Sequence, residues 1–244
     1  MLGVKTSKII KGLVIAAGTG AVAGTAYEIF YPRAQFFGKV ITHGSRKDMA
    51  VGIVFDRSPN QATAAICRRL HELSTPATFF IEGKRARAFP KSISPMQAFE
   101  TGVHGEDYKP LIFKKETSIR RSLKPTQILA MELQHKGARY LMPPYGFKDL
   151  RLIRVANELG LVVINPAINL KISQALPGQH PFRSISDAVT RLLLNVRPGD
   201  IILIPWKIQQ EMAGLMPDIL TEMIHGLKDI GLASWGLKAL IGRP

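Results

Sequence analysis

Residues 51–86 read VGIVFDRSPNQATAAICRRLHELSTPATFFIEGKRA and contain two strand-like segments with a helix-like segment between them. The first strand runs over 48–56; it is β-branched and apolar and ends in a polar corner, which is typical of a buried strand. Apolar residues at helical spacing follow over 61–73, and ATFFI at 77–81 predicts the second buried strand. A strand, a helix and a strand in series predict two parallel strands joined by a crossover helix.

The same alternation continues through the rest of the chain. Five further strands are predicted, at 98–103, 139–142, 161–165, 200–204 and 232–235. Helices are predicted at 117–136, 148–159, 184–196 and 215–230. We expect Pro125 to divide the first of these helices, and 174–182 to form a long loop. Seven strand–helix units without a nucleotide-type glycine loop favour an α/β fold, a distorted (β/α)7-type barrel, over an open doubly wound sheet.

The N-terminus has the layout of an export segment. Lys5, Lys8 and Lys11 precede an uncharged stretch, 12–27, that is rich in Gly, Ala and Val. A basic start, an apolar core and small residues predict a signal peptide cleaved after Ala23, while an uncleaved segment would serve as a membrane anchor. Both interpretations place the rest of the chain outside the cytoplasm. We therefore predict a signal or anchor with its linker over residues 1–35, and a barrel domain over residues 36–244.

The charge of the chain indicates an anionic partner. Lys and Arg number 33 and Asp and Glu 18, which gives a formal net charge of +15 over 244 residues. Cleavage after Ala23 would remove three lysines and no acids, leaving +12, so the basicity belongs to the main domain. An exported chain without a recognition motif argues against nucleic acid as the partner. The single cysteine, Cys67, excludes an intramolecular disulfide and a zinc site built from cysteines.

In a barrel of this kind, chemistry lies where the strands end in loops at their C-terminal ends. No P-loop, G-x-G-x-x-G, H-E-x-x-H or G-x-S-x-G motif occurs in the chain. The predicted corners hold polar and aromatic residues instead: Asp56, Arg57, Glu82, His104, the 143–146 loop, Asn165 and Trp206. Several basic clusters are candidates for an anion-binding rim, although each alone could simply be a solvated face: Lys84, Arg85 and Arg87, Lys114 and Lys115, and Arg120 and Arg121.

These motifs, in this order, resemble those of the polysaccharide deacetylases, carbohydrate esterase family 4. The family pattern is Thr-Phe-Asp-Asp-Gly-Pro-Asn, a helix and then Ala-Thr-Phe-Phe, where this chain has VFDRSPN at 54–60 and ATFF at 77–80. A Gly-x-His segment ends at His104, and MPPYG at 142–146 stands where the family has Arg-Pro-Pro-Tyr-Gly. The resemblance covers about residues 37–235 and implies a distorted (β/α) barrel.

The resemblance also implies a mechanism. A divalent metal, commonly zinc, is held by one Asp and two His and activates water for attack on an acetamide. A second Asp acts as general base, a His protonates the leaving amine, and a backbone N–H beside the Pro-Pro loop stabilises the oxyanion. In this chain Asp56 takes the general-base position and Tyr145 the oxyanion position. His104 takes the position of one metal-binding histidine.

The other positions depart from the family pattern. Arg57 replaces the metal-binding Asp and Tyr108 replaces the second His, while Met142 replaces an orienting Arg. The leaving-group His falls at Pro205 or Trp206. We expect Arg57 to repel a divalent cation, to pair with Asp56 and to depress its basicity. One remaining ligand cannot form the three-ligand site that catalytic zinc requires.

The sequence therefore predicts a deacetylase fold that has lost its metal chemistry, is exported, and binds a polysaccharide, which the basic charge suggests is anionic. The candidate substrate groove consists of Arg57, Tyr108, Pro143, Pro144, Tyr145 and Trp206. No cofactor is expected, and an uncleaved N-terminus would add contact with a membrane. The alternative is an active carbohydrate esterase that uses zinc or another divalent metal to remove N- or O-acetyl groups from a polysaccharide or peptidoglycan.

Plainer roles stand beside these functional ones. Asp56 could cap the helix that follows it or pair with Arg57. His104 could be a hydrogen-bonded residue at a strand end. Tyr108 and Trp206 could pack at the rim of the barrel instead of binding sugar rings.

Overall fold

The computed structural model describes residues 38–134, 138–166, 168–171 and 181–242. The predicted signal peptide or membrane anchor lies outside these described residues, and so does most of the loop predicted at 174–182. Within the described ranges, no helix is long and apolar enough to cross a membrane. The division into a leader over 1–35 and a barrel domain over 36–244 thus stays a prediction.

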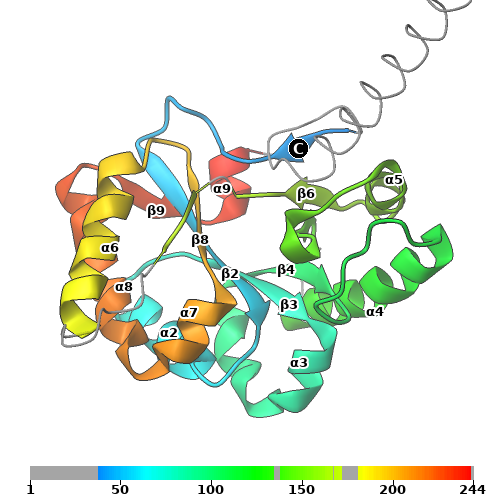
Figure 1. Cartoon of the computed structure of the whole chain (residues 1–244), viewed down its shortest axis with the longest axis horizontal. Coiled ribbons are helices and arrows are strands. Elements are labelled where there is room, and N and C mark those ends of the chain that lie inside the picture. Colours follow the sequence, from blue (N-terminus) through cyan, green and yellow to red (C-terminus); the bar gives the residue numbers. More distant parts are fainter. Residues whose placement is uncertain (1–37, 135–137, 167, 172–180, 243–244) are drawn as a thin grey trace, which may run out of the picture.

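A curled parallel sheet forms the centre of the molecule (Figure 1). Its strands follow the order β1-β6-β5-β4-β3-β2-β8-β7, and β9 pairs with β2. Every pairing between these strands is parallel, which is the arrangement that strand–helix alternation predicts. The strands are β1 (Val40–Ile41), β2 (Ala50–Ser58), β3 (Thr78–Glu82), β4 (Glu100–Gly105), β5 (Tyr140–Leu141), β6 (Val162–Ile164), β7 (Ile168–Asn169), β8 (Ile201–Ile204) and β9 (Ala233–Trp235).

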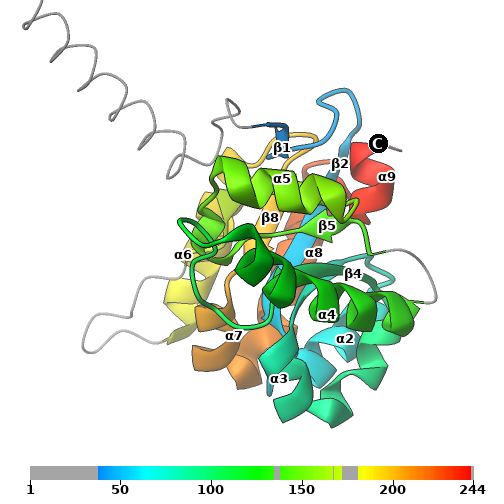
Figure 2. The same ribbon diagram turned by 90° about the vertical axis from the view of Figure 1, so that its right-hand side faces the viewer.

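Helices cover the outer side of the sheet, and Figure 2 shows α4 and α5 lying across β4 and β5. The helices are α2 (Thr63–Glu72), α3 (Gly83–Ala88), α4 (Glu116–Gln134), α5 (Leu150–Glu158), α6 (Pro181–Asn195), α7 (Trp206–Glu211), α8 (Met216–Asp229) and α9 (Leu237–Ile241). Short 3₁₀ turns are η1 (Pro90–Ser92), η2 (Ser94–Ala98), η3 (Pro144–Gly146) and η4 (Ala213–Leu215). The short helices α3 and α7 directly follow β3 and β8, so they lie at the C-terminal edge of the sheet.

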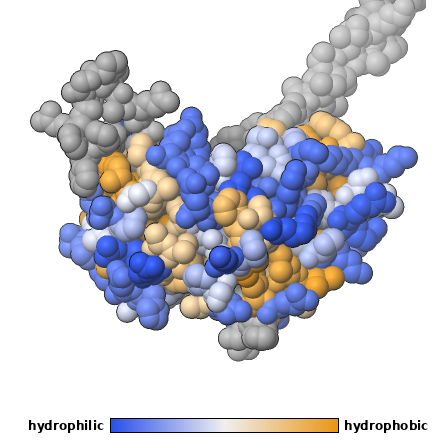
Figure 3. Space-filling view, turned by 90° about the horizontal axis from the view of Figure 1, so that it is seen from below, coloured by the Kyte–Doolittle hydropathy of each residue, from blue (hydrophilic) through white to orange (hydrophobic). Residues whose placement is uncertain are grey.

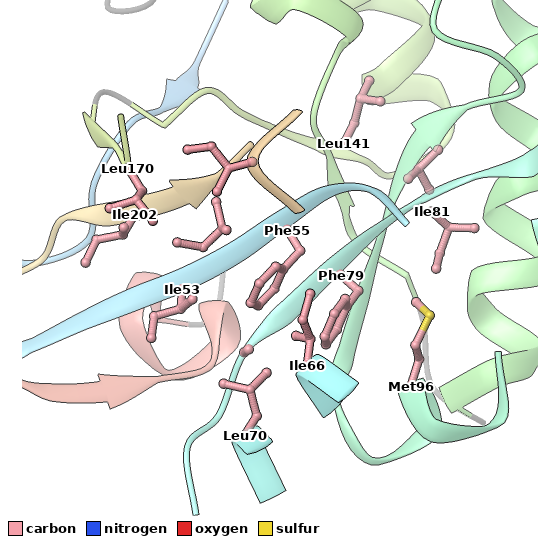
Figure 4. Close-up of a cluster of buried hydrophobic side chains, with 14 of the residues drawn as sticks. Ile53, Phe55, Ile66, Leu70, Phe79, Ile81, Met96, Leu141, Leu170 and Ile202 are labelled. Carbon is pink, nitrogen blue, oxygen red and sulfur yellow. The ribbon is translucent and has the colours of Figure 1, made fainter. Parts of the chain in front are cut away.

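Strand β2 is apolar along most of its length because both of its faces are buried. Phe55 packs on the outer side, where its ring stacks on Phe79 of β3 with the ring centres 4.8 Å apart. Figure 4 shows these two rings beside Ile66 and Leu70 of α2, and all four side chains belong to one buried cluster. Successive residues of a strand point to opposite faces, so Val54 belongs to a second cluster on the other side.

The second cluster closes the inside of the curl. Helix α9 contributes Leu237 and Leu240 to it. A side chain at Gly52 would bring a Cβ atom to 3.0 Å from Leu240 and 3.2 Å from Leu237, so the glycine allows α9 to lie close against β2. Burial on both faces is the reason that the sequence shows continuous apolar runs instead of alternation.

Two predicted elements differ from the structure. Pro125 does not divide the helix after β4, because α4 runs unbroken over Glu116–Gln134. Ile119 and Leu123 before the proline and Ala130 after it are buried in the same core, and this packing holds the two halves in line despite the missing N–H. Helix α6 begins at Pro181, inside the segment predicted as a loop.

Candidate functional site

The C-terminal ends of β2, β3, β4 and β8 bring together side chains that lie far apart in the sequence. Asp56 and Arg57 stand at the end of β2, Glu82 ends β3, His104 lies near the end of β4, and Trp206 begins α7 directly after β8. In Figure 1 the arrowhead of β2 ends near α3 and α7, the two short helices that frame this edge. The predicted corner residues therefore meet on one side of the barrel.

Arg57 is held in place by an ion pair and two aromatic rings. Its Nε atom donates a hydrogen bond of 2.9 Å to Glu82 Oε2. Its guanidinium carbon lies 4.2 Å from the centre of the Tyr108 ring and 4.1 Å from that of the Trp206 ring. The predicted pair with Asp56 is wrong: Arg57 has a left-handed backbone, with φ 51°, at an irregularity of β2, and its side chain reaches Glu82 instead.

Asp56 is buried, with 8% of its surface exposed, and it accepts a hydrogen bond from the backbone N–H of Trp206. Burial raises the pKa of Asp56 to about 7. The effect of burial is larger than the opposing effects of this hydrogen bond and of the Arg57 charge. The prediction that Asp56 is a weaker base than usual is therefore wrong. Asp56 does not cap α2 either, because it binds the first amide of α7.

A buried amide pair that the sequence reasoning missed fixes the end of β2 to α7. Asn60 donates a hydrogen bond of 2.6 Å from Nδ2 to Oε1 of Gln209. Gln209 in turn donates from Nε2 to the carbonyl oxygen of Ile204, at 2.8 Å, and to that of Asp56, at 3.4 Å. Both amides are fully buried. Because each partner lies about 150 residues from the other along the chain, no local sequence signal indicates the pair.

His104 is a buried neutral imidazole. Its Nδ1 donates to the carbonyl oxygen of Met142 over 2.6 Å, which agrees with the plain role of a hydrogen-bonded residue at a strand end. Burial lowers its pKa to about 3, and the nearby Arg57 charge acts in the same direction. With Nδ1 donating, Nε2 is an acceptor, and it has no partner in the described part of the chain.

Three aromatic rings continue from His104 across the edge of the barrel. Ring centres lie 5.4 Å apart for His104 and Tyr108, 4.3 Å for Tyr108 and Tyr145, and 5.5 Å for Tyr145 and Phe147. Tyr145 has a left-handed backbone, with φ 61°, and half of its surface is exposed. Burial raises the pKa of Tyr108, and a hydrogen bond from the Tyr145 backbone opposes that shift. The ring of Tyr108 therefore lies against the loop that carries the oxyanion position.

The predicted groove residues do not all line one cavity. Pro143 and Pro144 are buried, so they support the loop and offer little surface to a ligand. A groove of about 400 Å3 instead extends from Arg57 and Tyr108 toward α3. Its wall includes Glu82, Lys84, Arg85 and Lys109. Of the residues predicted as an anion-binding rim, only Lys84 and Arg85 line this groove, and they lie on a helix that the sequence did not predict.

The side chains of this site do not fit a divalent metal. Among the described residues, no group of three or more His, Cys, Asp or Glu is placed to hold a metal ion. His104 retains a suitable nitrogen, but a fixed guanidinium and a tyrosine stand at the two positions where the family has its other ligands. A cation cannot serve as a ligand and repels one bound nearby. No metal-dependent step therefore follows from this set of residues.

Comparison with known proteins gives a consistent picture. The profile of a family described as polysaccharide deacetylase matches residues 43–164. A chitooligosaccharide deacetylase of Azorhizobium caulinodans is 27% identical over 165 residues, which cover 66% of this chain and 75% of that protein. A chitooligosaccharide deacetylase of Sinorhizobium fredii is 28% identical over 159 residues, covering 64% and 71%.

Solved structures of similar fold include active and inactive proteins. A peptidoglycan N-acetylglucosamine deacetylase superposes with a TM-score of 0.70 at 21% identity, covering 83% of this chain and 92% of that one. A wild-type pseudoenzyme of carbohydrate esterase family 4 from Bacillus anthracis superposes with a TM-score of 0.69 at 18% identity, covering 84% and 69%. At this level of identity the match shows the fold, and the predicted distorted (β/α)7-type barrel is confirmed.

Proposed function

Because this chain belongs to the polysaccharide deacetylase family, we propose that it is a non-catalytic member that binds a carbohydrate polymer at the C-terminal edge of its barrel. One observation carries the proposal: the guanidinium of Arg57 is fixed by Glu82, Tyr108 and Trp206 at the position where the family has a metal-binding carboxylate. This arrangement replaces a negative charge by a positive one. It also gives the positive charge its own partners, so the site is complete without a metal.

The other catalytic positions support the same proposal. Met142 is buried and its side chain carries no charge, where the family has an orienting arginine. Trp206 carries no group that titrates near neutral pH, so it cannot protonate a leaving amine. The ring of Tyr108, at the position of a metal-binding histidine, packs against the ring of Tyr145 at the oxyanion position. Asp56 alone keeps a residue type that could act as a base.

Binding of a carbohydrate is supported by the surface that remains. The described edge offers the half-exposed ring of Tyr145 beside the stacked ring of Tyr108. Flat aromatic faces provide apolar contact with the C–H faces of pyranose rings, and a hydroxyl group keeps one end polar. Proteins similar in sequence carry the name chitooligosaccharide deacetylase, which makes a glycan the expected class of ligand. We also propose that the chain acts outside the cytoplasm, as its N-terminal sequence predicts.

A second candidate function is that of an active esterase. Two observations favour it: Asp56 has a pKa of about 7, suited to a general base at neutral pH, and Nε2 of His104 has no partner in the described residues. This function would require other residues to complete a metal site in place of Arg57 and Tyr108. The first proposal needs no such rearrangement.

Acetate release and glycan retention separate the two functions. The purified full chain is incubated with acetylated chitooligosaccharides and with peptidoglycan fragments in the presence of Zn²⁺ or Co²⁺, and acetate is measured. The proposal predicts no acetate above the level of an Asp56→Asn, His104→Gln double variant, together with measurable retention on a glycan column. Acetate release that the double variant abolishes would overturn the proposal.

A further inference from the structure

A groove beside Arg57 contains a second arginine that is fixed in the same manner. Arg85 of α3 donates a hydrogen bond of 3.0 Å from Nε to the carbonyl oxygen of Pro59. Its guanidinium carbon lies 5.2 Å from the centre of the Trp206 ring and 5.2 Å from that of the Phe89 ring. Arg57 and Arg85 both line the groove of about 400 Å3, a volume within the range of about 300–1,000 Å3 that small-molecule sites have.

Both arginines present unused hydrogen-bond donors. Among the described residues, the only hydrogen bond of each side chain is the one from its Nε atom, to Glu82 for Arg57 and to Pro59 for Arg85. The terminal Nη groups are therefore available to a ligand. Aromatic contacts fix the plane of each guanidinium, so little side-chain freedom is lost when an anion binds. A planar guanidinium edge matches the two oxygens of a carboxylate.

The balance of charge in the groove is positive and favours an anion. Its wall carries four cations, of which Arg57 pairs with Glu82 at 2.9 Å and Lys109 pairs with Asp107 at 3.1 Å. Lys84 and Arg85 remain as a surplus. Glu82 and Asp107 are each paired with a cation, so this surplus attracts a carboxylate and also a phosphate monoester, which carries about −1.5 to −2 at neutral pH. The apolar wall beside the cations distinguishes between them, because it suits a carboxylate carried on a ring.

The surface around the groove is mixed, which suits a charged sugar. Figure 3 shows strongly hydrophilic side chains among separate apolar patches on the face seen from below, where α3 lies. Tyr108 and Phe89 provide apolar wall beside the cations. An acidic sugar ring has the same two properties, an apolar C–H face and a carboxylate on one carbon.

We propose that this groove binds the carboxylate of a uronic acid unit, so that the glycan recognised by the chain is a polyuronate or contains uronic acid. The inference rests on the proposed function, because it specifies which carbohydrate the non-catalytic barrel takes. It adds a site next to the former metal centre, formed by α3 and by the turn that carries Tyr108. Arg85 and Lys84 supply the positive charge that distinguishes an acidic sugar from a neutral one.

Titration calorimetry on the full chain tests this inference with one matched pair of ligands, an oligogalacturonate and its methyl ester. The ester keeps the sugar and removes the charge. A charge-assisted hydrogen bond contributes enough to give about tenfold or more tighter binding of the acid. Arg85→Ala should abolish this preference, and Arg85→Lys should retain part of it because the charge stays while the planar edge is lost. Arg154→Ala, an exposed arginine on α5, is the matched control and should leave the preference unchanged.

Equal affinity for the acid and the ester would overturn the inference and leave the proposed function standing. Tighter binding of a sulfated oligosaccharide of the same length, or displacement of the acid by equimolar inorganic phosphate, would assign the groove to another anion and overturn the inference as well. Absence of binding to the acid, the ester and chitooligosaccharides would overturn both proposals. A thermal unfolding curve for each variant checks that the Arg85 substitutions leave the protein folded.

Discussion

The guanidinium carbon of Arg57 lies 4.1 Å from the centre of the Trp206 ring. The resemblance to the family puts a metal-binding Asp at the position of Arg57 and a leaving-group His at Pro205 or Trp206. Both replacements contact each other, and Trp206 also donates its backbone N–H to Asp56. The residues at these positions therefore form one mutually stabilising cluster of a cation, two aromatic rings and a buried carboxylate.

Removal of the Arg57 side chain should destabilise the fold. Arg57→Ala leaves the carboxylate of Glu82, only 3% exposed, without its ion-pair partner. We expect a loss of about 3 kcal/mol in the free energy of unfolding, measured by urea denaturation. The double variant Arg57→Ala, Glu82→Gln should recover part of this loss, because it removes the buried charge together with its partner. A loss below about 1 kcal/mol for Arg57→Ala, the value of an exposed pair, would contradict the account.

Asp56 should make stability depend on pH in an identifiable direction. Its pKa is about 7 in the folded state against 3.8 as the ordinary value, so the folded state holds a proton that the unfolded state has released. The contribution of Asp56 to the free energy of unfolding is therefore fully present below pH 4. It falls by on the order of 4 kcal/mol as the pH rises toward 7. The Asp56→Asn variant has no carboxyl group to titrate, so its free energy of unfolding should not fall in this way. The variant should therefore gain stability relative to wild type as the pH rises from 4 to 7.

His104 acts in the opposite direction, which is why the comparison with a variant is needed. Its pKa of about 3 in the folded state lies below the ordinary 6.5, so its contribution grows as the pH rises between these values. Unfolding measured at pH 4 to 8 for wild type, Asp56→Asn and His104→Gln separates the two effects. A stability difference between wild type and Asp56→Asn that stays constant over this range would show that Asp56 is not shifted.

The buried amide pair should be essential for the edge of the barrel. Gln209→Leu leaves the Nδ2 group of Asn60 and the carbonyl oxygen of Ile204 without a partner in the interior. We expect a loss of about 3 kcal/mol in the free energy of unfolding. Gln61→Leu, at the exposed position that directly follows Asn60, is the control and should change stability little. Equal effects of the two substitutions would mean that the pair adds nothing to stability.

Tyr145 should contribute to glycan binding without supporting the fold. Its ring is half exposed, so Tyr145→Ala should leave the thermal unfolding midpoint nearly unchanged. Affinity for the retained glycan should fall by about three- to tenfold, the value of one aromatic contact. Trp235→Ala removes a partly exposed ring from β9, which pairs with the start of β2, and should have no such effect on affinity. Identical affinities for Tyr145→Ala and wild type would exclude Tyr145 from the binding surface.

The architecture followed from the sequence where local pattern and tertiary packing agree. The apolar runs at 48–56 and 77–81 became β2 and β3 because both faces of the sheet are buried. The predicted break at Pro125 is wrong because the packing of α4 on both sides of the proline keeps the helix continuous. Short elements such as α3 and α7 have too few residues to show a helical period, so the sequence did not reveal them.

The positions of several site residues at strand ends followed from the sequence, but their partners did not. The order of motifs placed Asp56, Arg57, His104, Tyr108 and Trp206 at strand ends, where the structure has them close together. The pairing of Arg57 with Glu82 and the raised pKa of Asp56 depend on side-chain direction and burial. These arise only when strands that are distant in sequence are packed together.

The central claim is that Arg57 and Tyr108 alone prevent metal binding at a barrel edge that still contains His104. Metal content measured by mass spectrometry, after loading with Zn²⁺ and dialysis, tests it on wild type and on the double variant Arg57→Asp, Tyr108→His. The account predicts no stoichiometric zinc in wild type and close to one zinc per chain in the double variant, with a higher thermal midpoint when zinc is present. Stoichiometric zinc in wild type that is lost in His104→Ala would contradict it.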